Sequence, residues 1–525
     1  MPFALGTLIF ALAAALYART LAPSVLPGDY AEFQMCAAVL GVPHPTGYPL
    51  YILLGKLFTL LPVGDVAYRV NLSSAMYMAG AAALLYASAA RLATPLWPQA
   101  GRWTALAGAI FFAISPTVWS MALVARSYAL NALLVAAVVF SLISWRSTAR
   151  PRWFYSSCAL IGLSLVHHGT TYLLLPAYAL YLLLIEIQRK NEFRAEGHAS
   201  QAPDHKSKIQ NPGTLWVTKI RYALGALAFL AGLSPILFLV HRFLGGSPYY
   251  WGNPATWKDF FNLLTGGPFH NQVMGFGWGA QLERIAFGLN ELATQYTIPG
   301  ILLGILGLVV LWRTTRPEAL LLTLMLAGNF FFAMNYALVG YLYFIPTYLI
   351  FGILIAVGLA WLGQSAAALA ANRDTLASNL LKALAAACIL TLAAFTLVTR
   401  YPGIDQSAGT DTRDTALALL AAAPQGASIY LDWEDVSVIR FYRMVYGMRP
   451  DITLHTGDPA DWAKGIYCDL ASGVPAYIGK FAGAVPPIIS RDFTLQPGPM
   501  ASQVLKVTDA ARYEVPPCGL CATCR

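Results

Sequence analysis

The chain has 525 residues, of which 57% are hydrophobic and 11% are charged. Soluble domains carry about 25% charged residues, so this composition excludes an ordinary soluble protein and predicts several membrane spans. The formal net charge is +9, but most basic residues lie in short loops between apolar segments, where they set orientation in a membrane, so the charge does not predict nucleic-acid binding.

Apolar segments long enough to cross a membrane recur through the first 400 residues. They predict a mainly α-helical polytopic membrane domain over residues 1–400. We expect its first segment to be a span rather than a removable signal peptide, because no basic stretch precedes it. The eleven predicted spans are 3–21, 71–93, 103–122, 128–145, 154–167, 171–187, 220–241, 298–313, 318–335, 341–362 and 381–399.

Basic residues are concentrated in alternate loops. If the N-terminus lies in the cytoplasm, each predicted inner loop is basic, including the polar segment 188–219, in agreement with the enrichment of lysine and arginine in cytoplasmic loops. This orientation places loops 22–70 and 244–297 and the C-terminal region outside. We therefore predict a multi-pass protein of the cell membrane with an extracytoplasmic C-terminal domain.

The segment 27–51 is the first predicted outer loop, and it is not composed like a simple tether. Asp29 and Glu32 are spaced i and i+3, which places both carboxylates on one side of a helix. A turn rich in proline and glycine follows and contains His44. A structural explanation competes with a catalytic one, because both acids also suit the first turn of a helix and His44 fits a turn between two prolines.

Further ionisable residues lie at the outer ends of separate predicted spans, where they are costly to hold and are candidates for function by default. Each also has a structural explanation. Arg69 can extend to the membrane interface, Arg126 can anchor a turn, and the adjacent His167 and His168 can form a hydrogen-bonded pair, since no third metal ligand is evident there. The predicted outer set is Asp29, Glu32, His44, Arg69, Arg126, His167, His168, Arg242 and His270.

From about Tyr401 the composition becomes that of a soluble domain. No nucleotide-binding motif is present in it. Its tail carries Cys518, Cys521 and Cys524, whose spacing resembles half of a metal knuckle; a disulfide or a tail without metal is the alternative. Alternating helices and strands predict a small α/β domain over residues 401–525, with elements at 411–423, 427–431, 435–446 and 451–454.

Carboxylates and cations on one membrane face fit the transfer of a sugar from a polyprenyl phosphate. A carboxylate can take the proton of an acceptor hydroxyl that attacks the sugar, and arginine or histidine can stabilise the charge of the departing lipid phosphate. We predict no cofactor and assign no metal ligands, although two nearby carboxylates leave a divalent ion open. The aromatic-rich loop 244–297 fits either a membrane-interface belt or the lining of a sugar or lipid site.

The segments that carry these residues resemble a known family. Gly28-Asp29-Tyr30-Ala31-Glu32 and the stretch from Leu40 to Tyr51 are similar to the Gly-Asp-Ser-Gly-Glu and Gly-Val-Ala-His-Pro-Pro-Gly-Tyr-Pro-Leu-Tyr signature of a multi-pass family. Its animal members are protein O-mannosyltransferases, and it belongs to the type C glycosyltransferase (GT-C) superfamily. The resemblance covers nearly the whole chain. Other similar blocks are Arg69–Leu72, Ser115–Trp119, Tyr128–Asn131, Gly162–His168, Trp251–Pro254 and Arg449–Asp451.

The resemblance implies a GT-C-like fold and an inverting glycosyl transfer. The acidic pair of the superfamily maps onto Asp29 as general base and Glu32, which orients the acceptor or takes the base role itself. The implied partners are a polyprenyl-phosphate-linked sugar, with mannose as one candidate, a protein or glycan acceptor, and membrane lipid. Contacts with the donor phosphate or sugar are assigned to His44, Arg69, Arg126, His167 and His168.

Arg126 departs from the family pattern, in which a glutamate precedes the block that corresponds to Tyr128–Asn131. A cation in place of an acid can change which donor or acceptor the site binds. Two alternatives therefore stay open, namely a lipid or solute transporter and a non-catalytic glycan- or partner-binding scaffold of the same fold. A transporter is expected to place its ionisable residues near the bilayer midplane rather than at one face.

Overall fold

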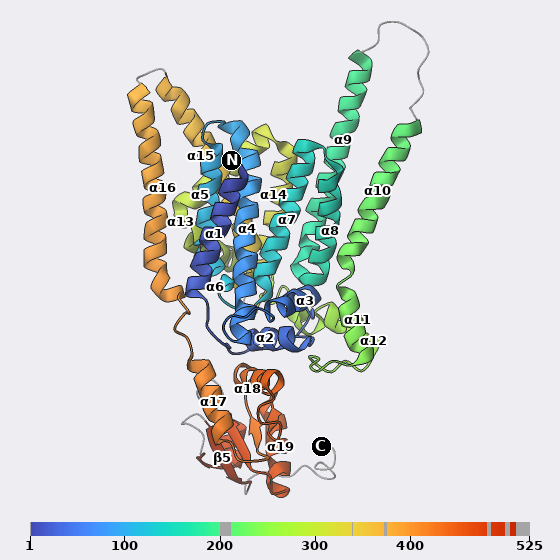
Figure 1. Ribbon diagram of the computed structural model, residues 1–525, viewed down its shortest axis with the longest axis vertical. Coiled ribbons are helices and arrows are strands. Elements are labelled where there is room, and N and C mark those ends of the chain that lie inside the picture. Colours follow the sequence, from blue (N-terminus) through green and yellow to red (C-terminus); the bar gives the residue numbers. More distant parts are fainter. Residues whose placement is uncertain are drawn as a thin grey trace.

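The computed structural model describes residues 2–199, 212–338, 340–371, 375–479, 485–498 and 504–510. Within these residues the chain forms a bundle of long helices with a small sheet near the C-terminus (Figure 1). The three cysteines of the predicted tail and the centre of the predicted inner loop, 200–211, lie outside the described residues.

Helices occupy all eleven predicted spans, because long apolar runs favour helices, although the runs that contain Pro116 and Pro235 are each divided into two helices. In chain order they are α1 (Pro2–Thr20), α4 (Val66–Leu96), α5 (Gly101–Ala113) with α6 (Pro116–Ala122), α7 (Ser127–Thr148), α8 (Pro151–His167), η1 (Gly169–Leu174) with α9 (Leu175–Ala199), α10 (Pro212–Leu233) with α11 (Ile236–Gly245), α13 (Gln281–Thr314), α14 (Arg316–Asn335), η3 (Gly340–Phe344) with α15 (Ile345–Ala371), and α16 (Thr375–Ile404).

Six of the described helices are long and apolar enough to cross a membrane by length and composition, or up to eight if each of two bent pairs counts as one span. The bent pairs are α5 with α6, which meet at 67°, and α10 with α11, which meet at 42°. The three remaining predicted spans fall on α1, α8 and α16. The mainly helical, polytopic class that the composition predicts is confirmed.

The predicted span 298–313 is only the second half of α13. The helix begins at Gln281, and Thr297 interrupts it with non-helical angles of φ 60° and ψ 169°, two residues before Pro299. Because residues 281–297 include many polar side chains, hydropathy alone does not predict the first half of α13. Part of the predicted outer loop 244–297 is therefore a helix that continues the bundle.

Glycines allow the central helices to approach one another closely. A Cβ at Gly307 of α13 would overlap the carbonyl oxygen of Leu354 in α15, and a Cβ at Gly358 would overlap that of Leu303. Burial of apolar surface does not drive helix association within lipid, so close backbone contact of this kind is a main source of stability there. These two contacts place α15 at the centre of the bundle, where 89% of its most apolar stretch is buried.

The connections between helices separate into two groups at opposite ends of the bundle (Figure 1). The upper end in the figure carries the start of α1 and the facing ends of α9 and α10. The predicted inner and outer loops therefore lie at different ends. The lower end carries the C-terminal sheet and four short helices, α2 (Asp29–Val39), α3 (Pro49–Phe58), α12 (Trp257–Leu264) and η2 (Gly267–Gln272).

The C-terminal part builds a five-stranded sheet in the order β2-β1-β3-β5-β4. Strand β1 pairs in parallel with β2 and β3, and β5 pairs antiparallel with β3 and β4. The four predicted elements between 411 and 454 are confirmed to within two residues at each end. The elements are α17 (Asp411–Ala422), β1 (Ser428–Tyr430), α18 (Trp433–Tyr446), β2 (Thr453–His455), α19 (Pro459–Ala471), β3 (Ala476–Gly479), α20 (Pro487–Asp492), β4 (Thr494–Pro497) and β5 (Val504–Asp509).

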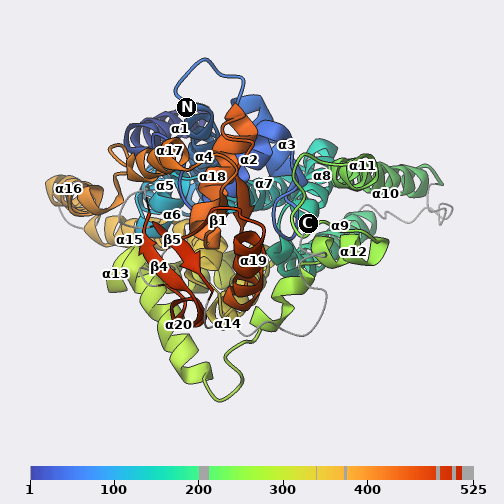
Figure 2. The same cartoon turned by 90° about the horizontal axis from the view of Figure 1, so that it is seen from below.

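Helix α18 lies against α2, as the view from below shows (Figure 2). The two helices are about 400 residues apart in the chain. This packing brings the C-terminal part directly onto the segment 22–70, the predicted first outer loop, and so onto the predicted acidic pair.

Candidate functional site

The site begins where α2 starts. Gly28 precedes the helix with φ 62° and ψ −134°, a conformation that residues with a Cβ rarely adopt. Its N–H group donates a hydrogen bond to the carbonyl oxygen of Glu434 in α18 at 3.0 Å, and a Cβ at Gly28 would collide with the Glu434 carboxylate. Glycine at this position therefore allows α18 to pack against the first turn of α2.

Asp29 is held by two side chains from distant parts of the chain. Arg126, the residue before α7, forms an ion pair with Asp29 Oδ2 through Nη2. Trp433 of α18 donates a hydrogen bond from Nε1 to Asp29 Oδ1 at 2.9 Å. The Arg126 guanidinium also lies over the ring of Tyr30, 5.0 Å from its centroid. The Asp29 side chain remains 28% exposed, so its carboxylate is fixed in place and still open on one side.

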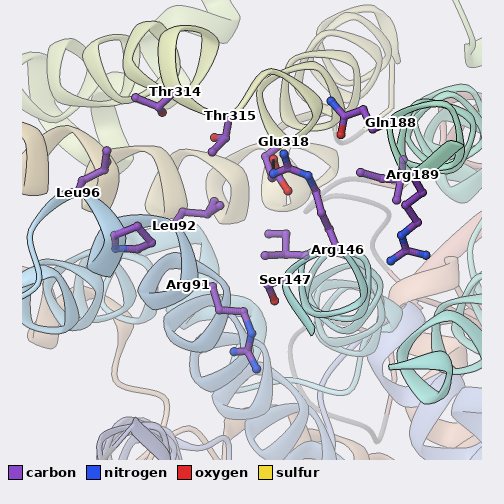
Figure 3. A pocket seen from close by; sticks show the side chains of 13 residues that line it. Arg91, Leu92, Leu96, Arg146, Ser147, Gln188, Arg189, Thr314, Thr315 and Glu318 are labelled. Carbon is purple, nitrogen blue, oxygen red and sulfur yellow. Dashed lines mark hydrogen bonds and ion pairs between the residues drawn. The ribbon is translucent and has the colours of Figure 1, made fainter. Parts of the chain in front are cut away.

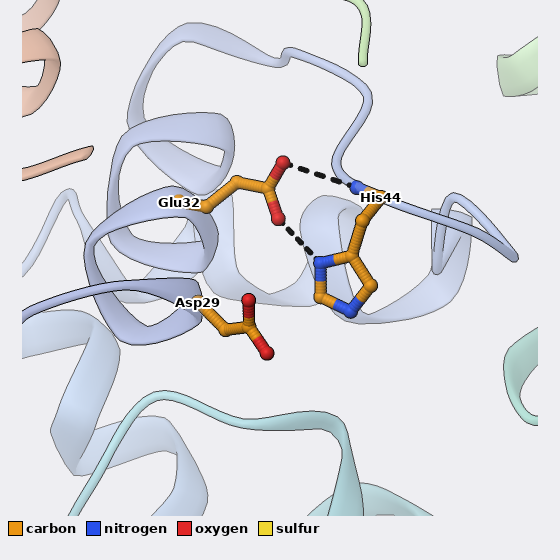
Figure 4. A group of neighbouring side chains, drawn as sticks. All are labelled: Asp29, Glu32 and His44. Carbon is orange, nitrogen blue, oxygen red and sulfur yellow. Dashed lines mark hydrogen bonds and ion pairs between the residues drawn. The ribbon is translucent and has the colours of Figure 1, made fainter. Parts of the chain in front are cut away.

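Glu32 is enclosed, with a side chain only 1% exposed. Its Oε1 atom accepts hydrogen bonds from the backbone N–H of His44 at 3.1 Å and from the Tyr249 hydroxyl at 3.0 Å. Its Oε2 atom forms an ion pair with His44 Nδ1 (Figure 4). Because Tyr249 belongs to the loop 244–297 and Val42 donates to its carbonyl oxygen at 2.8 Å, the second outer loop is fastened to the first beside this acid.

Asn71 joins the segments that carry the site. Its side-chain oxygen accepts from Gln34 Nε2 of α2 at 2.8 Å and from the backbone N–H of Ala125 at 2.9 Å. Its amide nitrogen donates to the carbonyl oxygen of Ala22 at 3.1 Å. Asn71 is fully buried, so one amide sets the position of Arg126, which follows Ala125, relative to α2.

The electrostatics of the cluster favour its charged forms. Burial alone would raise the pKa of the Asp29 carboxyl, but the nearby His44 and Arg126 and the Trp433 hydrogen bond together hold that pKa below its usual value. Burial alone would lower the pKa of His44, but Glu32 and Asp29 outweigh it, so the pKa of His44 is raised. The contacts within the cluster therefore favour the ionised form of Asp29 and the protonated form of His44.

Asp29, Glu32 and His44 also have the donor types of a metal site, and one donor atom from each lies within 4.8 Å of the others. His44 is the third ligand that the sequence does not identify. However, the positive charges of Arg126 and protonated His44 already balance those of the two carboxylates. A divalent cation would have to displace the proton of His44, so the charges favour two ion pairs over a metal centre.

The structure places the other predicted site residues apart from the acidic pair. Arg69 donates to the backbone carbonyls of Val63, Thr59 and Gly64 at 2.7, 2.9 and 3.0 Å, so its guanidinium holds the loop before α4. His167 is buried and contacts the carbonyl oxygen of Ser127 through Nε2 at 3.0 Å.

His168 is closer to the cluster. Its Nδ1 atom lies 2.8 Å from the Thr170 hydroxyl. The ring of Tyr48 connects it with His44, since the Tyr48 centroid is 5.4 Å from that of His44 and 6.2 Å from that of His168. Of the remaining outer residues, Arg242 lies over Phe238, and His270 contacts the carbonyl oxygen of Thr265 at 3.0 Å.

An apolar cavity of about 420 Å³ lies beside this aromatic connection. Its walls come from the turn after His44, the ends of α8, α10 and α14, and η2 and η3. His168 and His270 contribute polar groups, whereas most of the lining is aliphatic or aromatic, including Tyr48, Phe269, Tyr336 and Tyr343. The cluster of charges is thus adjacent to a space that suits an apolar chain.

The sequence does not predict the contribution of Trp433, Glu434 or Tyr249 to the site. Trp433 and Glu434 stand in an acidic run, Asp432 to Asp435, directly after β1. Such a run after a strand is a signal of a functional loop, but nothing in it indicates packing against residues 28 and 29. Tyr249 lies in an aromatic-rich loop whose residues are alike in composition, so its single contact with Glu32 is visible only in the fold.

The part of the chain that carries this site matches a known protein family. Residues 29–191 match the family model described as the protein O-mannosyl-transferase TMEM260 N-terminal domain. That segment begins at Asp29 and includes Glu32, His44, Arg126 and both adjacent histidines. The resemblance to the O-mannosyltransferase family is therefore confirmed over the segment that carries most of the site.

Two curated relatives carry the same name as that family model. The chain is 30% identical over 258 residues to protein O-mannosyl-transferase TMEM260 of Mus musculus, covering 48% of this chain and 32% of that protein. It is 26% identical over 325 residues to protein O-mannosyl-transferase tmem260 of Dictyostelium discoideum, covering 58% of this chain and 36% of that protein. The chain thus spans about a third of the length of these relatives.

Solved structures share the fold. ArnT from Cupriavidus metallidurans, bound to undecaprenyl phosphate, superposes with a TM-score of 0.54 at 14% identity over 97% of this chain and 99% of that chain. The Archaeoglobus fulgidus oligosaccharyltransferase, tethered to an acceptor peptide, gives a TM-score of 0.51 at 10% identity over 90% and 68% of the two chains. The predicted GT-C fold is confirmed.

Proposed function

We propose that this protein is a membrane glycosyltransferase that moves a sugar from a polyprenyl-phosphate donor to an acceptor hydroxyl. The observation that carries the proposal is the partly exposed Asp29 carboxylate, paired with Arg126 and connected through His44 and Tyr48 to an apolar cavity. A base and a cation next to a site for an apolar chain are what this transfer requires. The family match over residues 29–191 supports the same activity.

Asp29 rather than Glu32 is the proposed general base. The Glu32 side chain is 1% exposed, and three donor groups occupy its two oxygens. Asp29 is 28% exposed, so an acceptor hydroxyl can approach its carboxylate. Glu32 then acts as a positioning residue, because it orients His44 and keeps it protonated.

In the proposed step, the acceptor hydroxyl gives its proton to Asp29 as its oxygen forms a bond to the anomeric carbon. The bond between that carbon and the phosphate oxygen breaks, and its electron pair leaves with the lipid phosphate. Arg126 and protonated His44 are the nearest cations to stabilise the phosphate charge. Attack opposite the leaving group inverts the anomeric configuration.

The donor and acceptor classes follow from the same arrangement. The cavity beside His168 has the apolar lining that a polyprenyl chain needs, and the structurally similar ArnT binds undecaprenyl phosphate. The relatives are named protein O-mannosyl-transferases, which favours mannose as the sugar and a protein hydroxyl as the acceptor. The proposed orientation places the N-terminus in the cytoplasm and the site, with the domain 401–525, outside.

The deciding experiment measures sugar release from polyprenyl-phosphate-linked mannose by the purified, detergent-solubilised chain. Wild type is compared with Asp29→Asn and with Asp461→Asn, a matched control that removes an exposed carboxylate, 76% accessible, from α19 at the same end. We expect Asp29→Asn to lower kcat by about 10²–10⁴-fold, the usual contribution of a general base. The control should match wild type.

Full activity in Asp29→Asn would remove Asp29 from the base role. Donor binding by wild type without turnover, for every sugar tested, would instead favour the scaffold alternative. Flux of an intact donor across a vesicle membrane without sugar release would favour the transporter alternative.

A further inference from the structure

A second cavity, of about 590 Å³, lies at the end of the bundle opposite to Asp29. Helices α4, α7, α9 and α14, the end of α13 and the turn between α13 and α14 line it. Figure 3 shows side chains from all of these elements around it, with Arg146 reaching toward Glu318. The residues that matter for its chemistry are Arg91 of α4, Arg146 and Ser147 of α7, Arg189 of α9, Thr315 before α14, and Glu318 of α14.

The charges that line this cavity do not balance. Arg146 donates to Glu318 Oε2 at 2.6 Å, and the Tyr181 hydroxyl donates to Oε1 at 3.0 Å. The Glu318 side chain is 3% exposed, so both of its oxygens are occupied and enclosed. Three guanidinium groups therefore face one carboxylate, which leaves an excess of two positive charges.

Arg91 and Arg189 carry that excess. Arg91 lies 4.3 Å from the Phe140 ring centroid and Arg189 lies 4.2 Å from that of Trp145. Arg91 Nη1 donates to the carbonyl oxygen of Ala87 at 3.0 Å, and Arg189 Nη2 donates to that of Trp145 at 3.2 Å. When a guanidinium stacks on an aromatic ring, the ring holds its plane in position. The N–H groups at the edge of that plane remain directed outward, in the geometry that binds phosphate.

Glu186 does not remove this excess. Its Oε1 atom lies 3.9 Å from Arg189 Nη1 but only 2.8 Å from Arg221 Nη2, so its stronger ion pair is with Arg221. Arg221 is not among the residues that line the cavity. The Glu186 carboxylate therefore balances a cation outside the cavity.

An unpaired hydroxyl supports the same interpretation independently. Thr315 Oγ1 is buried and has no hydrogen-bond partner among the described residues. Thr315 precedes α14, a helix of 20 residues whose N-terminal N–H groups favour negative charge. A phosphate oxygen in this position would accept the orphaned hydroxyl proton and interact with the helix end.

We propose that this cavity binds the phosphate head group of an anionic membrane lipid. The cavity lies where apolar helices end, its walls include Leu92, Ile143 and Ile185, and the half-exposed Trp312 nearby is typical of a membrane interface. Basic cavities between the cytoplasmic ends of membrane helices are suited to such head groups. The proposal goes beyond the transfer reaction and does not depend on it.

The test uses the purified full chain in detergent and measures bound phosphatidylglycerol and phosphatidylcholine of equal chain length by native mass spectrometry. Wild type is compared with Arg91→Gln/Arg189→Gln and with the control Arg150→Gln/Arg152→Gln, which removes two exposed charges from the same end outside the cavity. We expect wild type to prefer phosphatidylglycerol. The cavity variant should lose that preference by roughly 10- to 30-fold, while the control changes less than twofold.

Each other outcome overturns the proposal. Equal loss in the control would mean general attraction to a basic surface, and no preference in wild type would mean no lipid site. If inorganic phosphate raises the Tm of wild type but not of the cavity variant, and phosphatidylglycerol is not preferred, the ligand is a soluble anion. Should the double variant fail to fold, Thr315→Val keeps the shape and should still weaken phosphatidylglycerol binding about threefold; an unchanged affinity would exclude the site.

Discussion

At the lower end of the bundle, Asp29 faces Arg126 and Glu32 faces His44, so two carboxylates meet two cations. At the upper end, three arginines line a cavity whose single carboxylate, Glu318, pairs with only one of them, Arg146. Both ends combine cations with carboxylates, yet the ion pairs at the first balance and the charges at the second do not. A balanced set suits a neutral hydroxyl that must approach a fixed carboxylate, whereas an unbalanced set suits a ligand that brings its own negative charge.

Removing one carboxylate from the balanced end should have the largest effect. In Glu32→Gln, His44 loses one of the two carboxylates that raise its pKa, so that pKa falls and a smaller fraction of the imidazole is protonated at neutral pH. Losing a cation that stabilises the phosphate charge lowers turnover by about 10²–10³-fold, so we expect a fall of that order in kcat/KM at neutral pH. The measurement is a pH profile of sugar transfer.

The pH profile separates this role from a purely structural one. A raised pKa in the folded protein means that the protonated form is lost as pH rises through it. Glu32→Gln should therefore recover part of its activity as pH is lowered, because His44 regains its proton. A loss that is uniform at all pH values, with an unchanged Tm, would contradict the assignment.

Removing a cation from the same end should have the next largest effect. Arg126→Gln deletes the ion pair that helps to lower the pKa of Asp29, so that pKa rises. The acid limb of kcat/KM should then move to higher pH, because Asp29 becomes protonated earlier as pH falls. We expect about 10²-fold less transfer at neutral pH, as for the loss of one group that stabilises developing charge. Arg126→Lys, the conservative control, should restore most of the charge effect but not the geometry of the guanidinium.

Trp433→Phe tests the contact between α18 and Asp29. The variant keeps the ring and deletes the N–H group that donates to Asp29 Oδ1. A hydrogen bond to a charged group is worth about 1.5–3 kcal/mol, so we expect about tenfold lower kcat and an acid limb moved in the same direction as in Arg126→Gln. Trp462→Phe, in the buried core of the C-terminal sheet, is the control. Equal loss in both variants would indicate general weakening of the C-terminal part.

The smallest effect is expected from increasing the excess positive charge of the cavity at the upper end. Glu318→Gln keeps one acceptor oxygen near Arg146 and Tyr181 but removes the only carboxylate that lines the cavity within the described residues. Phosphatidylglycerol should bind about fivefold more tightly, which corresponds to roughly 1 kcal/mol of Coulomb energy. Glu283→Gln, an exposed acid at the other end, should leave binding unchanged. Weaker binding in Glu318→Gln would show that charge excess is not what the cavity uses.

Much of the fold follows from local patterns. Apolar runs place the long helices, and the proline and glycine residues around His44 place the turn. Two features depend on packing instead. The first half of α13 is too polar to be predicted as part of a long helix, and β3, β4 and β5 are short strands that become visible only through their pairing in the sheet, β3 with β1 and β5 with β3 and β4.

The site divides in the same way. Asp29 and Glu32 are spaced i and i+3, so their spacing predicts that both lie on one side of a helix, whereas the contact of His44 with Glu32 depends on how the turn packs. Arg69 and Arg126 have the same charge and similar positions at helix ends, yet only Arg126 contacts the acidic pair, because Asn71 fixes the turn before α7 against α2. Residue type and position alone do not distinguish the two arginines.

The contact between Asp29 and Trp433 spans 404 residues, and this spacing has a consequence for biogenesis. At about 5–20 residues per second, the ribosome needs roughly 20–80 s to make the chain between them. During that time the first loop has already left the ribosome while α18 does not yet exist. The Asp29 carboxylate thus reaches its final environment only after α18 has been made, so under the proposed function a shorter nascent chain does not yet have the complete site.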